Sequence, residues 1–171
     1  MNKKYLKIAV SLLSGFYFIH YASYAKNINN WNWIDNVNLI FHEAGHTIFF
    51  FLGEFIQVLA GSAFQIFIPC VFAIYFFFWR KEYFSGSIIF FWIGQNILNV
   101  AVYMGDAIKQ QLPLLGGDSV IHDWNYMLSS TGLLKYTDTL STITFNIGFL
   151  TIITASVLCV YLSFETRESK V

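Results

Sequence analysis

Three ionisable residues lie within five positions of an apolar part of the chain, in the order His42-Glu43-Ala44-Gly45-His46. This is the pattern H-E-x-x-H, and residues four positions apart lie on one face of a helix. Two neutral imidazoles at this spacing can bind one Zn²⁺. Glu43 can reach a metal-bound water, take its proton and later pass it to a leaving amine. The motif therefore predicts metal-assisted hydrolysis; the alternative is a polar cluster that joins helices.

A catalytic zinc site usually has three protein ligands and one open position. Asp106 is the preferred third ligand, because it ends an apolar stretch in which Asn99 lies seven residues earlier on the same helix face. His122 is the alternative third ligand, and Asp123 or Asp118 would then orient an imidazole by a hydrogen bond. Without a metal, Asp106 would be a carboxylate at a helix end, and His122-Asp123 would belong to a surface loop.

Two amides precede Asp106 in the same apolar stretch. Asn96 and Asn99 could bind the backbone of an unwound substrate through hydrogen bonds. Contacts between neighbouring membrane helices would explain these residues equally well. The sequence therefore allows two roles for Asn96 and Asn99, substrate binding and helix packing.

The composition indicates a protein that lies within a lipid bilayer. Hydrophobic residues make up 56% of the 171 residues, and charged residues make up 12%. Soluble domains carry roughly 25% charged residues, about twice this share. Disorder, an ordinary soluble enzyme and a nucleic-acid-binding domain are therefore excluded. The net charge of zero also gives no attraction toward nucleic acid.

The hydropathy pattern predicts an all-α membrane protein with about five transmembrane helices, because a span needs about 20 apolar residues. The chain would form a single membrane-integral domain, residues 1–171, with the H-E-x-x-H motif on its second span. The predicted spans are about 8–25, 37–53, 63–79, 87–104 and 141–164, and residues 107–140 form a polar loop. Glycines at 53 and 61 mark the expected break between the second and third spans. Residues 8–25 could instead be a cleaved secretory signal, although an uncleaved span is preferred.

The H-E-A-G-H sequence in a membrane helix resembles the site-2-protease-like metallopeptidases, which are membrane-integral zinc proteases. In that family a second helix supplies an asparagine and, nearby, an aspartate that completes the zinc site. The matching stretch here is Gln95-Asn96-Ile97-Leu98-Asn99, followed by Gly105-Asp106-Ala107. The resemblance covers about residues 37–107 and implies one Zn²⁺ held by His42, His46 and Asp106. The usual N-P-x-x-x-L-D-G string and a PDZ domain are absent.

The sequence therefore supports three hypotheses. The first is a zinc-dependent intramembrane endopeptidase that cleaves membrane-embedded polypeptides, with Glu43 as the catalytic base. The second is a non-catalytic membrane protein whose metal or polar cluster is structural or handles ions. The third is hydrolysis of a non-peptide substrate, such as a lipid-linked amide. A bacterial cytoplasmic membrane is the default location. The membrane orientation is not predicted, because Lys and Arg divide evenly between the two sides. The oligomeric state is not predicted either.

Overall fold

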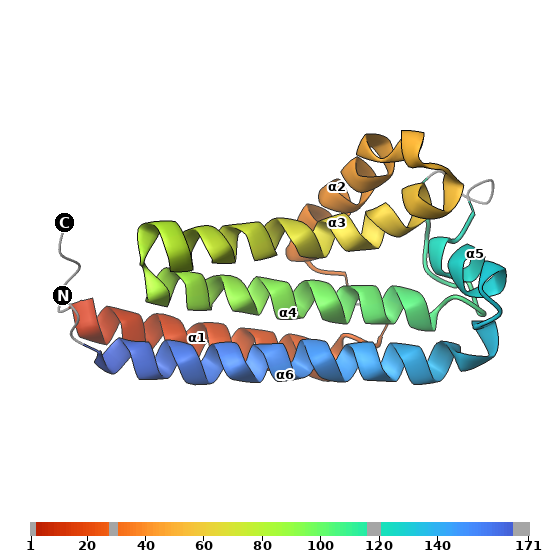
Figure 1. Ribbon diagram of the computed structural model, residues 1–171. Helices are drawn as coiled ribbons and strands as arrows, with labels where there is room; N and C mark the ends of the chain where they lie inside the picture. The colour runs from red at the N-terminus through yellow and green to blue at the C-terminus, as the bar shows by residue number, and fades with distance from the viewer. Residues whose placement is uncertain (1–2, 28–30, 116–120, 166–171) are drawn as a thin grey trace.

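The computed structural model describes residues 3–27, 31–115 and 121–165, and its regular structure there is entirely helical (Figure 1). This confirms the predicted all-α class. The helices are α1 (Lys3–Tyr24), α2 (Trp33–Ile48), α3 (Glu54–Ile74), α4 (Tyr83–Gly105), α5 (Asp123–Ser130) and α6 (Thr137–Phe164). Shorter turns are the 3₁₀ segments Phe50–Leu52 and Leu134–Tyr136 and the π-helical segment Tyr75–Arg80.

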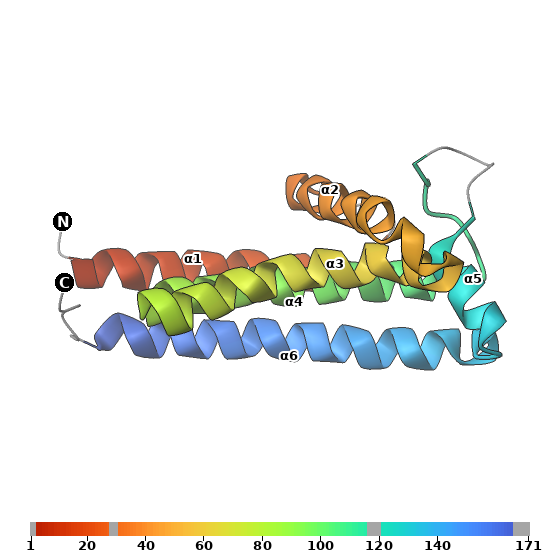
Figure 2. The ribbon, with the colours of Figure 1, turned by 45° about the horizontal axis from the view of Figure 1, so that its top comes forward.

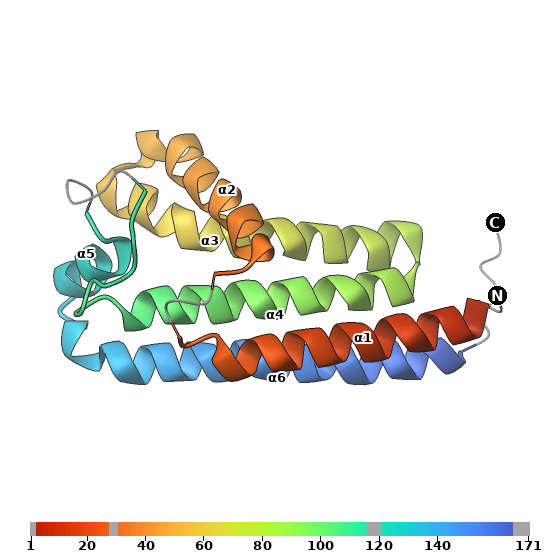
Figure 3. The same ribbon diagram turned by 180° about the vertical axis from the view of Figure 1, so that it is seen from behind.

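Four long helices, α1, α3, α4 and α6, run alongside one another (Figure 1). Helix α6 packs against both α4 and α1, while α3 packs against α4. Helix α2 crosses α3 at an angle and stands out from the four-helix layer, as Figure 2 shows. The short helix α5 lies at the end of the bundle where α4 ends and α6 begins (Figure 3). Contacts of α5 with α3 and α4 place it at that same end.

Three helical stretches of the described chain are long and apolar enough to cross a membrane. They are Glu54–Arg80, Tyr83–Gly105 and Leu134–Phe164. The sequence predicts about five spans, and the first two of these correspond to α1 and α2. Helix α2 has only 16 residues, and α1 has 22 residues but interrupts its apolar run with tyrosines, serines and His20.

The break between the second and third predicted spans lies earlier than expected. The chain turns at Gly53, whose φ of 89° is in the region that favours glycine, and α3 begins at Glu54. Gly61, predicted to mark this break together with Gly53, lies inside α3. Residues 54–62 are therefore helical. The early start of α3 brings Gly61 alongside α2.

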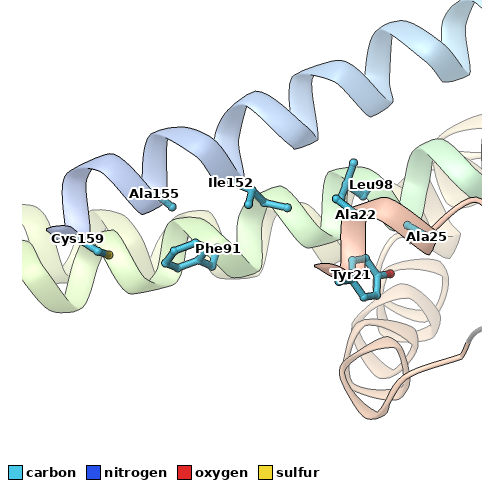
Figure 4. Close-up of a cluster of buried hydrophobic side chains, with 8 residues drawn as sticks. All are labelled: Tyr21, Ala22, Ala25, Phe91, Leu98, Ile152, Ala155 and Cys159. Atoms are coloured by element: carbon cyan, nitrogen blue, oxygen red, sulfur yellow. The ribbon is translucent and has the colours of Figure 1, made fainter. Parts of the chain in front are cut away.

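A hydrophobic cluster holds α1, α4 and α6 together (Figure 4). Its fully buried members include Phe91, Leu98 and Ile152. Close approach of α4 and α6 depends on two glycines. A Cβ at Gly94 would lie 2.9 Å from the carbonyl oxygen of Gly148 and 3.1 Å from the backbone nitrogen of Ile152. Small residues at such crossings allow the helix backbones to pack closely in membranes.

Replacing Gly94 by alanine should destabilise the α4–α6 contact, because the new methyl group would meet backbone that can move only with its helix. We expect a loss of about 1–3 kcal/mol in the free energy of unfolding, as for other overpacked interiors. Denaturant unfolding of detergent-purified protein measures it. Gly15→Ala is the matched control, since its Cβ would meet only the side chain of Ser156. Equal stability of the two variants would contradict this account of the crossing.

Candidate metal centre

The two histidines of the motif lie one turn apart on α2. Their ring centroids are 4.7 Å apart, and His42 is buried while His46 is half-buried. Helix α2 is fixed at its start by Asp35, whose carboxylate accepts a hydrogen bond from the backbone N–H of Asn32 at 2.8 Å. This contact satisfies one of the free N–H groups at the helix N-terminus. The i, i+4 spacing therefore places both imidazoles on the same side of a capped helix.

Two glycines let α2 and α3 approach closely at the histidines. A Cβ at Gly45 would overlap the backbone carbonyl of Ala60. A Cβ at Gly61 would lie 2.5 Å from the Nε2 of His46 and 2.7 Å from the Nε2 of His42. The surface of α3 opposite the motif is thus bare backbone. The Nε2 atoms of both imidazoles occupy the space that a side chain would fill.

The third member of the cluster is Asp123, the first residue of α5. Its Oδ2 lies 2.9 Å from the Nε2 of His42 and 3.1 Å from the Nε2 of His46. Around a tetrahedral zinc ion with bonds of about 2.0–2.2 Å, ligand atoms lie about 3.3 Å apart. The three side chains therefore form a group that could hold a metal ion.

Hydrogen bonds on the far side of each ring orient its metal-facing nitrogen. The Nδ1 of His46 lies 2.8 Å from the backbone carbonyl oxygen of Gln57, which can only accept, so Nδ1 must donate. The Nδ1 of His42 lies 3.0 Å from the side-chain oxygen of Gln65. In a neutral imidazole the Nε2 atom then carries a lone pair. Two nitrogen lone pairs and a carboxylate oxygen converge, which requires a cation or additional protons between them.

Asp123 is ionised in this setting. Burial raises the pKa of its carboxyl group, but the two imidazoles, when they carry protons on Nε2, outweigh burial and hold the pKa below its ordinary value. The carboxylate is also at the N-terminus of α5, where the helix dipole favours negative charge. Metal ligands must be deprotonated, so Asp123 has the required charge state.

Three neighbouring residues and the backbone of Asp123 tie the start of α5 to α3 and to the end of α4. The backbone N–H of Asp123 donates to the Tyr103 hydroxyl at 3.2 Å, and Trp124 donates to Ser62 at 3.1 Å. Asn125 donates to the carbonyl of Ala107 at 2.8 Å. His122 caps the helix by accepting from the N–H of Asn125. Contacts made by Asp123 itself and by the residues before and after it in the sequence therefore determine its position.

The structure does not bring Asp106 to the histidines. Its carboxylate accepts hydrogen bonds from the backbone N–H groups of Gln111 and Leu112, at 3.0 and 2.9 Å, so it closes the turn that follows α4. The carboxylate reaches this turn because the helix ends just before Asp106 and the chain bends back over it. Asp106 therefore stabilises the loop end, and Asp123 occupies the place expected for it.

His122, the alternative third ligand, faces Asp106. Its Nε2 lies 3.5 Å from the Oδ2 of Asp106 and has no hydrogen-bond partner among the described residues. Burial lowers the pKa of His122, against the opposing effect of the Asp106 carboxylate. His122 thus supports the start of α5. Asp118, the other acid weighed as its partner, lies outside the described residues.

Glu43 lines a cavity of about 360 Å³ that also reaches His42, Asp35 and Asn99. Most of its wall is apolar. The apolar lining includes Leu39, Val102, Leu112, Pro113, Leu114 and Leu115. Glu43 is exposed, unlike the buried His42 beside it. A carboxylate therefore stands at the edge of the metal-binding group, facing space that a substrate could enter.

The two candidate substrate-binding amides have different surroundings. Asn99 lines the cavity. Asn96 is completely buried, donates to the carbonyl of Trp92 at 3.0 Å and accepts from Gln65 at 3.3 Å. Asn96 is thus engaged in contacts between α3 and α4. Asn99 is also hydrogen-bonded, to Gln65 and Asp35, and differs from Asn96 in that part of its side chain faces the cavity.

Asp123, Gln65 and Gly61 are the site residues that the sequence does not assign directly. One signal for Asp123 is present: it precedes an apolar pattern at Trp124, Met127 and Leu128, which is typical of a short amphipathic helix beginning at an acid. Which end of that helix meets the histidines depends on tertiary packing.

Comparison with protein-family models, curated proteins and solved structures found no match to this chain. The resemblance to the site-2-protease-like metallopeptidases therefore rests on the motif and its apolar setting. Asp106, the aspartate that this resemblance assigns to the metal, does not join the histidines.

Replacing Asp123 by alanine should abolish binding of one zinc per chain, because it removes the only carboxylate in the group of three. Elemental analysis of detergent-purified protein measures bound zinc. Asp106→Ala and His122→Ala are the matched controls and should retain more zinc than Asp123→Ala, since neither side chain reaches the histidines. Zinc retained in Asp123→Ala but lost in Asp106→Ala would reverse the assignment.

Gly61→Ala should weaken zinc binding while the protein stays folded. The added methyl group would lie against the Nε2 atoms of both histidines, where a metal must bind. Zinc content and thermal unfolding, measured on the same preparation, separate the two effects. Ala63→Gly, two positions along α3, is the control. Undiminished zinc content in Gly61→Ala would show that the metal lies away from α3.

Proposed function

We propose that this protein is a zinc-dependent endopeptidase that hydrolyses membrane-embedded polypeptides. The observation that carries the proposal is the convergence of His42, His46 and Asp123, with Glu43 directly beside the first ligand. Two imidazoles and one carboxylate are the donor set of a known class of catalytic zinc sites, in which the fourth position is open. The three membrane-length helices support a location in a bilayer.

The arrangement of the remaining acids and histidines supports an open fourth position. A structural zinc site would use four protein ligands. Asp106 and His122, which the sequence offers as further ligands, face each other, and Asp106 also accepts from the loop that follows α4. The group found among the described residues has three members. This favours hydrolysis over the alternative of a structural or ion-handling cluster.

The proposed reaction adds water across a peptide bond. A bound zinc ion would supply a Lewis acid that polarises the substrate carbonyl and lowers the pKa of a water molecule. Glu43 accepts one proton of that water as its oxygen adds to the carbonyl carbon. Glu43 then gives the proton to the amide nitrogen as the C–N bond breaks. The exposed carboxylate of Glu43 has the freedom to serve in both steps.

The cavity supports a peptide substrate with apolar side chains. Leucines at positions 39, 112, 114 and 115 line it together with polar side chains, among them Asn99. Peptide bonds inside a membrane helix are already hydrogen-bonded, so a substrate must unwind before its carbonyl can be attacked. A polar group within an apolar cavity suits a locally unwound segment. A lipid-linked amide would share the carbonyl chemistry and is an outcome of the test.

Glu43→Gln should retain zinc and lose hydrolysis by about 10²- to 10⁴-fold, the usual contribution of a general base. The assay uses fluorescently labelled single-span peptides of varied sequence, reconstituted with the protein in vesicles, with products identified by mass spectrometry. Glu54→Gln is the matched control, because Glu54 lies outside the cavity lining.

Three results would contradict the proposal. Equal cleavage by the wild type and Glu43→Gln would remove the assigned base. Stoichiometric zinc with no peptide cleavage by the wild type would favour a structural site. Cleavage restricted to lipid-linked amides would replace the substrate class while leaving the zinc chemistry in place.

A further inference from the structure

Helices α2, α3 and α4 share a chain of hydrogen-bonded side chains that begins at the buried Asp35, passes through the half-buried Asn99 and returns to His42. The Nδ2 of Asn99 donates to the Oδ1 of Asp35 at 3.3 Å. The Nε2 of Gln65 donates to the Oδ1 of Asn99 at 3.1 Å. The Oε1 of Gln65 then faces the Nδ1 of His42 at 3.0 Å. Asp35 and His42 are seven residues apart, on the same face of α2.

Asp35 can only accept hydrogen bonds in this environment. It is 2% exposed, and its four hydrogen-bond partners among the described residues all donate to it. They are Tyr21, Gln95, Asn99 and the backbone N–H of Asn32. The Tyr21 hydroxyl itself accepts from Gln95 at 3.1 Å, so its proton points toward Asp35. Each of these partners in the described part of the chain is a donor, an arrangement that matches the carboxylate form of Asp35.

Because the carboxylate of Asp35 only accepts, it fixes the donor and acceptor of every later hydrogen bond in this series. Asn99 must turn its NH₂ group to Asp35, which leaves its oxygen toward Gln65. Gln65 must turn its NH₂ group to that oxygen, which leaves its own oxygen toward His42. His42 must then donate from Nδ1 and keep the lone pair on Nε2.

A second branch imposes the same direction independently. The backbone carbonyl of Trp92 can only accept, and it accepts from the Nδ2 of Asn96 at 3.0 Å. The Oδ1 of Asn96 therefore faces the Nε2 of Gln65, at 3.3 Å. Gln65 is 3% exposed and its amide is bonded at both ends. The Asp35 carboxylate, through Asn99, and the Trp92 carbonyl, through Asn96, therefore impose the same orientation on the amide of Gln65.

We infer that Asp35, acting through Asn99 and Gln65, is a positioning residue for the metal ligand His42. The chain holds the imidazole in the tautomer whose Nε2 lone pair points to the metal position beside Asp123. Partners that orient ligating histidines in this way contribute strongly to metal affinity. The inference rests on the proposed zinc site, and it assigns a role to a buried carboxylate that takes no part in the hydrolysis.

The test measures metal binding without any substrate. Affinity for Co²⁺ is determined by competition with a coloured chelator in detergent-purified protein, and the Co²⁺ absorption spectrum reports ligand geometry. Gln65→Met removes the acceptor for His42 and should weaken binding by about 10- to 100-fold. Gln65→Glu keeps an acceptor at that position and should bind more tightly than Gln65→Met. Asn99→Leu and Asp35→Asn should each weaken binding by a smaller factor.

Ser11→Ala is the matched control for loss of a buried polar contact. Ser11 is 1% exposed and contacts Ser163 at 3.0 Å between α1 and α6, away from the chain. Its affinity for Co²⁺ should equal that of the wild type. A second readout is the Nδ1–H proton of His42 in zinc-loaded protein labelled with ¹⁵N-histidine. Its exchange with solvent should be slow in the wild type and faster in Asn99→Leu, which a purely structural role would not cause.

The possible outcomes separate this inference from the proposed function. If Asn99→Leu and Asp35→Asn bind Co²⁺ with the same affinity as Ser11→Ala, the inference is overturned. This holds even if Gln65→Met binds Co²⁺ more weakly than the wild type. If Gln65→Met fails to fold, Gln65→Glu and Asn99→Leu decide in its place. A wild type that binds no Co²⁺ contradicts both the zinc site and the chain. A wild type that binds metal but cleaves no peptide contradicts only the endopeptidase.

Discussion

The arrangement of this protein depends on one electrostatic constraint: two nitrogen lone pairs and a carboxylate oxygen point at the same place. The Nε2 atoms of His42 and His46 lie 2.9 and 3.1 Å from a single oxygen of Asp123. Lone pairs repel at such distances unless positive charge lies between them. A backbone carbonyl holds His46 in this orientation from behind, so the ring cannot relieve the repulsion by changing its tautomer. The group could hold a cation, and protons on the Nε2 atoms would relieve the same repulsion.

The rest of the fold serves this convergence in two ways. Glycines at 45 and 61 remove side chains where α2 crosses α3, so that the imidazoles fit against bare backbone. The start of α5 is anchored to α3 and to the end of α4, which fixes the carboxylate of Asp123. Packing among α1, α4 and α6 is largely apolar, with Phe91, Leu98 and Ile152 fully buried. Polar chemistry is therefore concentrated on the α2–α3–α4 side, and the opposite side provides the apolar packing.

Sequence patterns predict the local features of this molecule and miss those that depend on packing between distant segments. The helical class follows from long apolar runs, and the pairing of His42 with His46 follows from a spacing that any helix converts into one face. Asp106 looked suitable because it shares a helix with two amides, but the local turn after α4 uses its carboxylate. Asp123 is 77 positions beyond His46 in the chain. Only the docking of α5 brings them together, and no local pattern encodes that contact.

Charge balance explains why two acids belong beside the histidines. With neutral imidazoles, the buried carboxylate of Asp123 carries a negative charge beside His42 and His46, and the carboxylate of Glu43 lies at the neighbouring cavity. An uncompensated buried charge is costly in a medium of low polarity. A divalent cation cancels both charges, whereas two protonated imidazoles would cancel them only by abandoning their Nε2 lone pairs. Transfer of a proton to Glu43 during hydrolysis would be matched by negative charge that develops on the substrate oxygen. In the proposed reaction the net charge of the site would stay constant, and this would limit the reorganisation that an apolar environment opposes.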